Sequence, residues 1–301
     1  MSESEFVTKV APDEVFGLLA SDIRIDIVQT LWETDTQLSF SELHSQVGMR
    51  DSGQFNYHLD KLVGRFVRQT DDGYELTQAG KQINGAIERG AYTMRATVDP
   101  IELQSPCTLC GGAQRLEYED EVVCIHCTDC PTTHEFVVPP GVLAEYDRHE
   151  IPDAASRYLR ATFFHISKGF CTFCEGAVTS RIKPLTEIDE IPTHAEDEIG
   201  VPPEKLPMVS YECQRCNSSP TAGLSFVLLY HPAVIGFFYD HGINVETVGL
   251  WDSVEAEMEL GRIHTHEPFR AGVKYSVGEE TLTVVVDEQL TVVETDRAMV
   301  R

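Results

Sequence analysis

The chain has 301 residues, enough for two or three domains, and its apolar content of 42% is ordinary for a globular protein. Its charge is unusual, because 49 acidic residues outnumber 23 basic ones and give a net charge of -26. Such a charge repels nucleic acids and anionic membranes in general, so a nucleic-acid function requires a locally basic surface. Only seven of the basic residues are lysines. Few lysines and many acids favour a protein of a halophilic organism, in which salt screens the like charges, over the alternative of a merely acidic protein of a mesophile.

The chain carries no sequence signal for secretion or for membrane insertion. Its first residues, MSESEF, lack a basic region followed by an apolar run, so no signal peptide is predicted. The longest uncharged stretch ends at Tyr239 and is interrupted by Ser225, His231 and Pro232, which argues against a membrane span. We therefore expect a soluble, cytoplasmic protein.

The first hundred residues differ from the rest in charge and in cysteine content. Residues 1–100 have a net charge of -7 and contain no cysteine, whereas residues 101–301 have a net charge of -19 and contain all nine cysteines. This shift predicts a domain boundary near residue 100.

The N-terminal region is predicted to be a set of helices around one hairpin. Apolar residues recur at intervals of three and four over residues 13–32, which predicts an amphipathic helix. A short helix capped by Ser39 or Ser41 follows and ends at Gly48. The other predicted elements are a helix opened by Asp51 or Ser52 that includes Phe66, strands over 67–70 and 74–77, and a helix over 78–94. This order is that of a winged helix-turn-helix domain.

Two stretches of this region carry a family resemblance. The run DSGQFNYHLDKLVGRFVRQTDDGYELTQAG, residues 51–80, and the segment SDIRIDIVQTL, residues 21–31, resemble the ArsR-like winged-helix regulators of haloarchaea. The resemblance covers the N-terminal third and implies a DNA-binding transcription regulator whose third helix enters the major groove. ArsR-type metal sensors often carry cysteines in the helix-turn-helix. This region has none, which excludes metal sensing at that position.

The third helix and the start of the wing form the predicted DNA contact. Residues 50–68 have a net charge of +2 within the acidic chain. Amide side chains suit adenine edges, and basic side chains suit phosphate or guanine. Asp60 would repel phosphate, so the N-terminal half of the helix must face DNA. The alternatives are a solvated helix face or a winged helix that contacts protein. The candidate contacts are Ser52, Gln54, Asn56, Tyr57, Lys61, Arg65 and Arg68.

Eight of the nine cysteines fall in CxxC pairs, a spacing that predicts metal sites rather than disulfides. Four thiolates around Zn²⁺ leave no open position for a water, so the metal is expected to be structural. The alternative is an iron–sulfur or redox-sensing site. The first predicted zinc site is Cys107, Cys110, Cys127 and Cys130, and the second is Cys171, Cys174, Cys213 and Cys216.

An internal repeat indicates the role of the ninth cysteine, Cys124. Residues 135–151 and 226–243 are both predicted to form a strand and a proline-opened helix, followed by a Tyr-Asp pair and a histidine before isoleucine. Extended backwards, the repeat aligns Cys124 with Ser210. Cys124 is therefore predicted to be a small core residue in a strand rather than a ligand, and thiol chemistry beside the site stays open.

The remaining segments complete an α+β protein. Residues 183–207 contain five prolines and seven acids and are predicted to be a long insertion, either inert or a partner-binding lid. We expect helices over 153–168 and 252–260 and a β-meander with strands over 270–277, 281–286 and 290–294. The predicted domains are a winged helix-turn-helix over 1–100, a zinc ribbon with a helical extension over 101–168, and a second ribbon with a helix and the meander over 169–301.

The combined prediction is a sequence-specific DNA-binding transcription regulator with a zinc-stabilised C-terminal sensor or interaction region. We expect a homodimer on double-stranded DNA and a protein or small-molecule effector at the C-terminal region. The alternatives are a zinc-ribbon adaptor that binds protein and a thiol-based redox sensor. His264 and His266 form an HxH pair that is more typical of a surface loop than of a metal site. No catalytic motif is recognisable, so we expect no enzyme.

Overall fold

The computed structural model describes residues 6, 8–34, 36–107, 110–130, 132–188, 201–247, 250–251 and 256–299. The protein is α+β and divides into two units, Met1–Arg95 and Ala96–Arg301. None of the described helices is long and apolar enough to cross a membrane.

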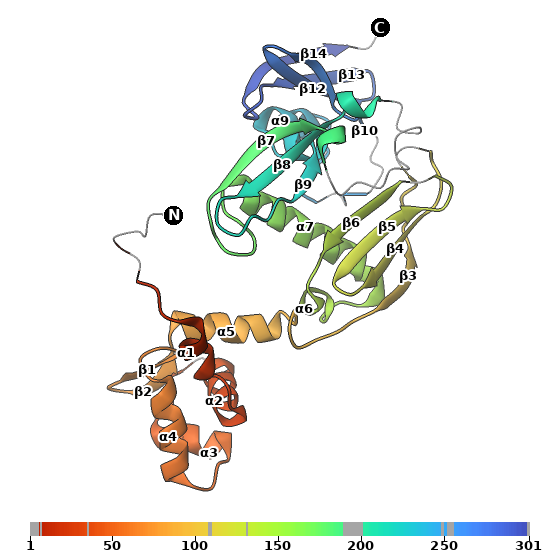
Figure 1. Cartoon of the computed structure of the whole chain (residues 1–301). Helices are drawn as coiled ribbons and strands as arrows, with labels where there is room; N and C mark the ends of the chain where they lie inside the picture. Colours follow the sequence, from red (N-terminus) through yellow and green to blue (C-terminus); the bar gives the residue numbers. More distant parts are fainter. Residues whose placement is uncertain are drawn as a thin grey trace. The chain divides into compact units, whose positions relative to one another are not determined.

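The described part of the first unit contains five helices and a hairpin around one apolar core (Figure 1). Ile27, Leu43, Phe55 and Leu59 are fully buried at its centre. This arrangement is consistent with the predicted winged helix-turn-helix, in which the hairpin is the wing. The elements are α1 (Pro12–Gly17), α2 (Asp22–Glu33), α3 (Phe40–Val47), α4 (Ser52–Leu62), β1 (Val67–Thr70), β2 (Gly73–Leu76) and α5 (Gln78–Glu88).

Three predicted helices of this unit have other bounds in the structure. The helix expected over residues 13–32 is two helices, because Ser21 has an extended backbone that interrupts the helix before α2 begins at Asp22. The third helix ends at Leu62, and Phe66 lies beyond it in a turn formed by Gly64 at φ 88°. The helix expected to reach residue 94 ends at Glu88, since Gly90 adopts φ 79°.

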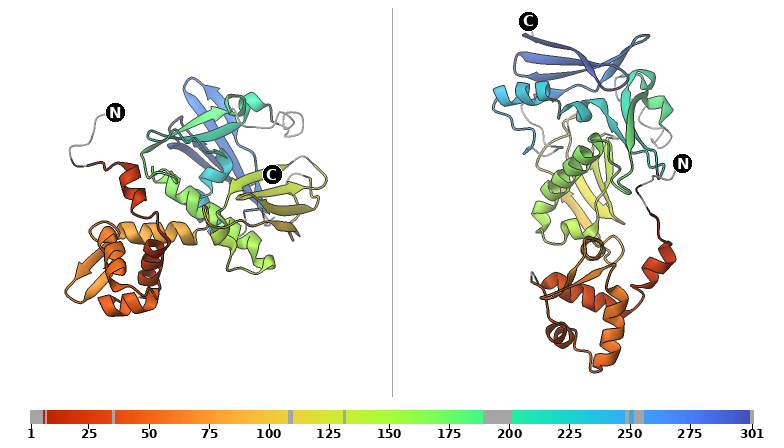
Figure 2. Two further views of the ribbon diagram at one scale, coloured as in Figure 1. Left: turned by 60° about the horizontal axis from the view of Figure 1, so that its bottom comes forward. Right: turned by 90° about the vertical axis from the view of Figure 1, so that its left-hand side faces the viewer.

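The second unit begins with an antiparallel sheet of order β3-β4-β5-β6. Helix α7 packs on this sheet through Ile151, Ala154 and Ala155, which share an apolar cluster with Leu116 and Ile125 (Figure 2). The elements are β3 (Val98–Glu102), β4 (Gln114–Glu119), β5 (Val122–Cys127), β6 (Thr133–Val137), α6 (Pro140–Leu143), η1 (Arg148–Glu150) and α7 (Ile151–Ser167).

A three-stranded antiparallel sheet, two helices and a five-stranded sheet complete the second unit and share one core. The C-terminal sheet contains the predicted β-meander, with β10 and β11 both paired to β12. Its third strand, expected over residues 290–294, is Val292–Met299 in the structure. The elements are β7 (Val178–Pro184), η2 (Leu185–Glu187), η3 (Pro203–Lys205), β8 (Pro207–Cys213), β9 (Thr221–Gly223), α8 (Leu224–Leu228), α9 (Pro232–Asp240), β10 (Ala256–Met258), β11 (Arg262–His266), β12 (Phe269–Val277), β13 (Glu280–Val286) and β14 (Val292–Met299).

Two predictions for this unit were wrong. The apolar run after residue 225 is helix α8 rather than a strand, because Leu224 and Leu228 are buried together at helical spacing. The short helix expected over residues 252–260 has its first residues outside the described part, and among its described residues 256–260, residues 256–258 form strand β10 against β12. Most of the insertion at 183–207 also lies outside the described residues.

The predicted internal repeat has a structural counterpart in its cysteine-bearing part, whereas its later segments differ, β6 and α6 in the first copy against helices α8 and α9 in the second. In each copy, a strand that follows one CxxC pair lies antiparallel to a central strand that leads into the next pair. Gln114 pairs with Cys127 in the first copy, and Val178 pairs with Cys213 in the second. The loops that carry the cysteines therefore meet at one end of each small sheet.

Candidate DNA-binding helix and metal centres

Helix α4 is the candidate recognition element, and its start is fixed by local hydrogen bonds. The carboxylate of Asp51 accepts hydrogen bonds from the backbone N–H groups of Gly53 and Gln54 at 2.8 and 2.9 Å. The preceding helix α3 ends at Gly48 in the left-handed conformation. Because a carboxylate already occupies the positive end of α4, side chains rather than the helix terminus are available to meet DNA.

One face of α4 packs inward and the other is exposed. Phe55, Leu59 and Leu62 are completely buried. Seven residues of the sequence-based candidate set lie on or next to this helix, and they are all exposed: Ser52, Gln54, Asn56, Tyr57 and Lys61 on α4, Arg65 in the following turn and Arg68 on β1.

Some of the candidate DNA-contact side chains are bonded to other side chains of the protein, and others are not. The Asn56 side-chain amide donates to Asp60 at 2.8 Å, one helical turn away. Arg68 pairs with Glu75 across the hairpin. The ammonium group of Lys61 lies 5.4 Å from the centre of the Tyr57 ring, a cation–π arrangement that keeps both side chains outward. Gln54 and Arg65 have no side-chain partner within the described part of the chain.

The wing is acidic at its tip. Asp71 and Asp72 are exposed in the turn between β1 and β2. The guanidinium of Arg68 and then the amide of Gln37 lower the pKa of Glu75, so this carboxylate holds the basic side chain of the wing. The positive charge available to a phosphate therefore lies on α4 and the turn after it, rather than on the hairpin.

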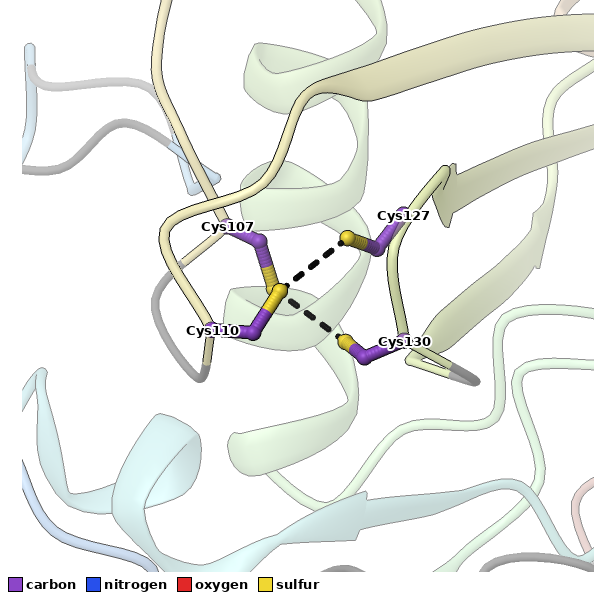
Figure 3. Close-up of side chains that lie close together, drawn as sticks. All are labelled: Cys107, Cys110, Cys127 and Cys130. Atoms are coloured by element: carbon purple, nitrogen blue, oxygen red, sulfur yellow. Dashed lines mark hydrogen bonds between the residues drawn. The ribbon is translucent and has the colours of Figure 1, made fainter.

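The first cysteine cluster lies at the open end of the β4–β5 hairpin, opposite its turn (Figure 3). Its sulfurs approach in pairs, Cys110 to Cys127 at 3.4 Å and Cys107 to Cys130 at 3.7 Å. The backbone N–H of Gly112 points at the sulfur of Cys110 at 3.3 Å. Such N–H groups stabilise thiolates in the tight turns of zinc ribbons.

The second cluster repeats this geometry between α7, β7 and β8. Cys174 and Cys213 are 3.5 Å apart, and Cys171 and Cys216 are 3.6 Å apart. The turns after the cysteine pairs hold Glu175 at φ 55° and, after Cys216, a second left-handed residue, Asn217. The same eight cysteines that the CxxC spacing groups thus form two sets of four, with all ligand atoms of a set within 4.8 Å.

These distances fit a tetrahedral zinc ion. Four sulfurs at about 2.3 Å from zinc would be separated by roughly 3.8 Å, whereas a disulfide requires about 2.0 Å. The closest sulfur pairs, at 3.4 to 3.7 Å, match the metal-bound spacing. The four-thiol donor set of each cluster therefore suits zinc.

Two of the thiols have a lowered pKa. Backbone N–H groups of Cys216 and Arg215 lower the pKa of Cys213 to about 6, and hydrogen bonds from Thr132 lower the pKa of Cys130 to about 7. Burial raises the pKa of Cys174 to about 12. A divalent cation among the sulfurs would favour the thiolate at every position, because the ion is the largest local charge.

Cys124 lies apart from both clusters. It is on the half-exposed face of β5, paired across the strands with Glu117 and Glu135, rather than in the core as expected. Burial and the two carboxylates raise the pKa of its thiol, which makes it a poor nucleophile. His264 packs over Gly272 on β12, and the HxH pair joins no group of metal-ligating atoms within the described residues.

The comparisons with known proteins match the chain in two places. The DUF7351 domain of unknown function matches residues 104–292, which include both cysteine clusters. The DUF7347 domain of unknown function matches residues 12–87, the segment from α1 to α5. No curated protein and no solved structure matches the chain.

Proposed function

The chain belongs to the DUF7351 family, and with that as premise we propose that it is a sequence-specific DNA-binding transcription regulator. In this proposal the first unit is an ArsR-like winged helix-turn-helix of the haloarchaeal type. Its helix α4 enters the major groove of double-stranded DNA, and two chains bind two half-sites as a homodimer. The protein is a non-enzymatic, cytoplasmic regulator.

The observation that carries this proposal is the exposed polar face of α4. Gln54 offers an amide that can read an adenine edge, and Lys61 and Arg65 offer cations for phosphate or guanine. All three are exposed and remain available, whereas Asn56 and Arg68 would first have to release their carboxylate partners. We therefore assign base reading to Gln54 and phosphate positioning to the two cations.

The two cysteine clusters would hold structural zinc in this account. Zinc bound by four thiolates supplies folding free energy to small modules, about 10–16 kcal/mol in isolated zinc-finger peptides. Each cluster here closes a sheet of only three or four strands. The zinc-stabilised unit then serves as the sensor or interaction region that sets when the first unit binds DNA.

Sequencing of genomic fragments captured by the purified chain tests the DNA-binding proposal. We expect enrichment of a recurring sequence with two related half-sites, because each chain of a homodimer reads one half. Captured fragments that match the input in composition would refute sequence-specific binding.

The acidic wing tip favours a second candidate, a protein-binding adaptor. Asp71 and Asp72 would repel the DNA backbone, and Glu75 neutralises Arg68. In an adaptor the winged helix is a scaffold and α4 contacts a protein. An adaptor would capture no DNA in the experiment above.

A further inference from the structure

An exposed group of aromatic and cationic side chains surrounds the first loop of the second cysteine cluster. We call it the aromatic–cationic surface and define it by Phe164, His165, Lys168, Phe170, Phe173 and Arg215. The three phenylalanines are 58%, 52% and 74% exposed in sequence order. Apolar rings this exposed within one short stretch of the chain, residues 164–173, commonly mark a binding surface.

Contacts hold several members of the group in pairs beside the cysteine loop. The ammonium of Lys168 lies 4.8 Å from the centre of the Phe164 ring, and the rings of His165 and Phe170 are 6.0 Å apart. Arg215 donates to the carbonyl oxygen of Cys174, the residue after Phe173. The cysteine loop thereby fixes the backbone beneath both Phe173 and Arg215.

The stretch of sequence that contains most of this surface is basic, unlike the rest of the unit, although Lys183 within it is paired with Glu212 on β8. Residues 154–186 contain five basic residues and one acid, within a region of net charge -19. The carboxylate of the single acid, Glu175, accepts a hydrogen bond from Nε2 of His165 at 3.0 Å and is therefore already paired. A polyanion is the partner that such a local reversal selects.

The first cluster provides an internal comparison. In its second CxxC pair the residue before the last cysteine is Asp129, and the corresponding residue of the second cluster is Arg215. Both residues lie against the glycine that follows the first pair, Gly112 in one cluster and Gly176 in the other. The repeat thus keeps the loop geometry and changes the sign of the charge, so the zinc fold itself does not require a cation here.

We propose that the aromatic–cationic surface binds single-stranded nucleic acid. Exposed rings can stack on the faces of unpaired bases, which a duplex covers, and Lys168 and Arg215 can contact the phosphates between them. Stacking is little affected by salt, which suits a protein whose composition indicates very high salt. An acidic peptide would meet the two cations and leave the three rings without planar partners.

Fluorescence anisotropy with labelled oligonucleotides of about 12 thymidines or uridines, a length within the usual site range, tests this with the full chain. We expect the double variant Phe164→Ala, Phe173→Ala to weaken binding about tenfold or more, since each stacked base contributes measurably. Tyr239→Ala is the matched control, because Tyr239 is 75% exposed on α9 of the same unit. This control is expected to bind as the unmodified chain does.

Further arms separate this surface from α4 and from a protein partner. Gln54→Ala combined with Lys61→Ala is expected to leave oligonucleotide binding unchanged, whatever its effect on duplex DNA. Lys168→Glu, which keeps all three rings, is expected to weaken binding while the zinc content stays at two per chain, which excludes misfolding. Equal affinity in the unmodified chain and both surface variants would overturn the proposal. Tighter binding of a labelled polyglutamate peptide would overturn it in favour of an acidic protein.

Discussion

Gly176 determines how closely the second cysteine cluster can pack. A Cβ at this position would lie 2.8 Å from the Cβ of Arg215 and 3.1 and 3.2 Å from the sulfurs of Cys174 and Cys213. We expect Gly176→Ala to reduce bound zinc from two ions per chain to one, measured by elemental analysis. Gly236→Ala is the control, because a Cβ there meets nothing within 4 Å. Two zinc ions in both variants would contradict this role.

Glu75 determines whether Arg68 can reach a phosphate. Replacing it as Glu75→Gln removes the negative charge that holds the guanidinium across the hairpin. We expect tighter binding to duplex DNA. The slope of log affinity against log salt concentration should also become steeper by about one released counterion, measured by titration at several salt concentrations. Arg68→Gln alone should change affinity little. A large loss of affinity in Arg68→Gln would show that Arg68 already contacts DNA in the bound state.

Helix α4 depends on its N-cap. Asp51→Ala removes two hydrogen bonds to backbone N–H groups, which typically costs about 1 kcal/mol of unfolding free energy. We expect the first unit to unfold at a lower denaturant concentration than in the unmodified chain. Unfolding is measured by the circular dichroism signal of the helices. Asp51→Asn should retain most of the stability, because asparagine is an equally good cap. Equal losses in the two variants would mean that charge rather than capping is responsible.

Several elements could be predicted from sequence because their signals are local. The CxxC pairs, the helix-turn-helix with its hairpin and the C-terminal meander all depend on spacing within a few residues, and the α+β fold they imply is confirmed. Helix α8 could not be predicted, since a short apolar run is equally compatible with a strand and a buried helix. Strand β10 exists through its pairing with β12, a contact that no local pattern records.

The same limit applies to the candidate DNA contacts. Amide and cation positions on α4 could be read from helical periodicity, but their partners could not. Arg68 and Glu75 are brought together by the register of the hairpin, which pairs the two residues directly. The exposed rings beside the second cluster also escaped prediction, because only the structure shows that Phe164 and Phe173 are uncovered.

At the scale of the whole molecule, removal of zinc should affect the stability of the second unit and leave that of the first unit unchanged. The first unit contains no cysteine, so chelation is expected to unfold the second unit alone. The chain has two tryptophans, Trp32 in the first unit and buried Trp251 in the second. In a Trp32→Phe variant we expect the emission to shift to longer wavelength on chelation, and in a Trp251→Phe variant we expect no shift. A shift in both variants would mean that the units unfold together.

The net charge of -26 is concentrated after residue 100, and two short stretches reverse it. One contains α4, and the other surrounds the first loop of the second cysteine cluster. In very high salt, release of counterions contributes little to DNA affinity, so base-edge contacts should carry more of it than phosphate charge does. In our proposal the acidity reflects a solvent of high salt, and the two reversals are the sites of binding.

The most direct measurement is the affinity of the full chain for its captured duplex site, compared with a triple variant carrying Gln54→Ala, Lys61→Ala and Arg65→Ala. These three side chains are exposed, so the variant should fold and keep two zinc ions. We expect the variant to lose specific binding, with only weak, sequence-independent binding left. Unchanged affinity for the site would contradict DNA recognition by α4.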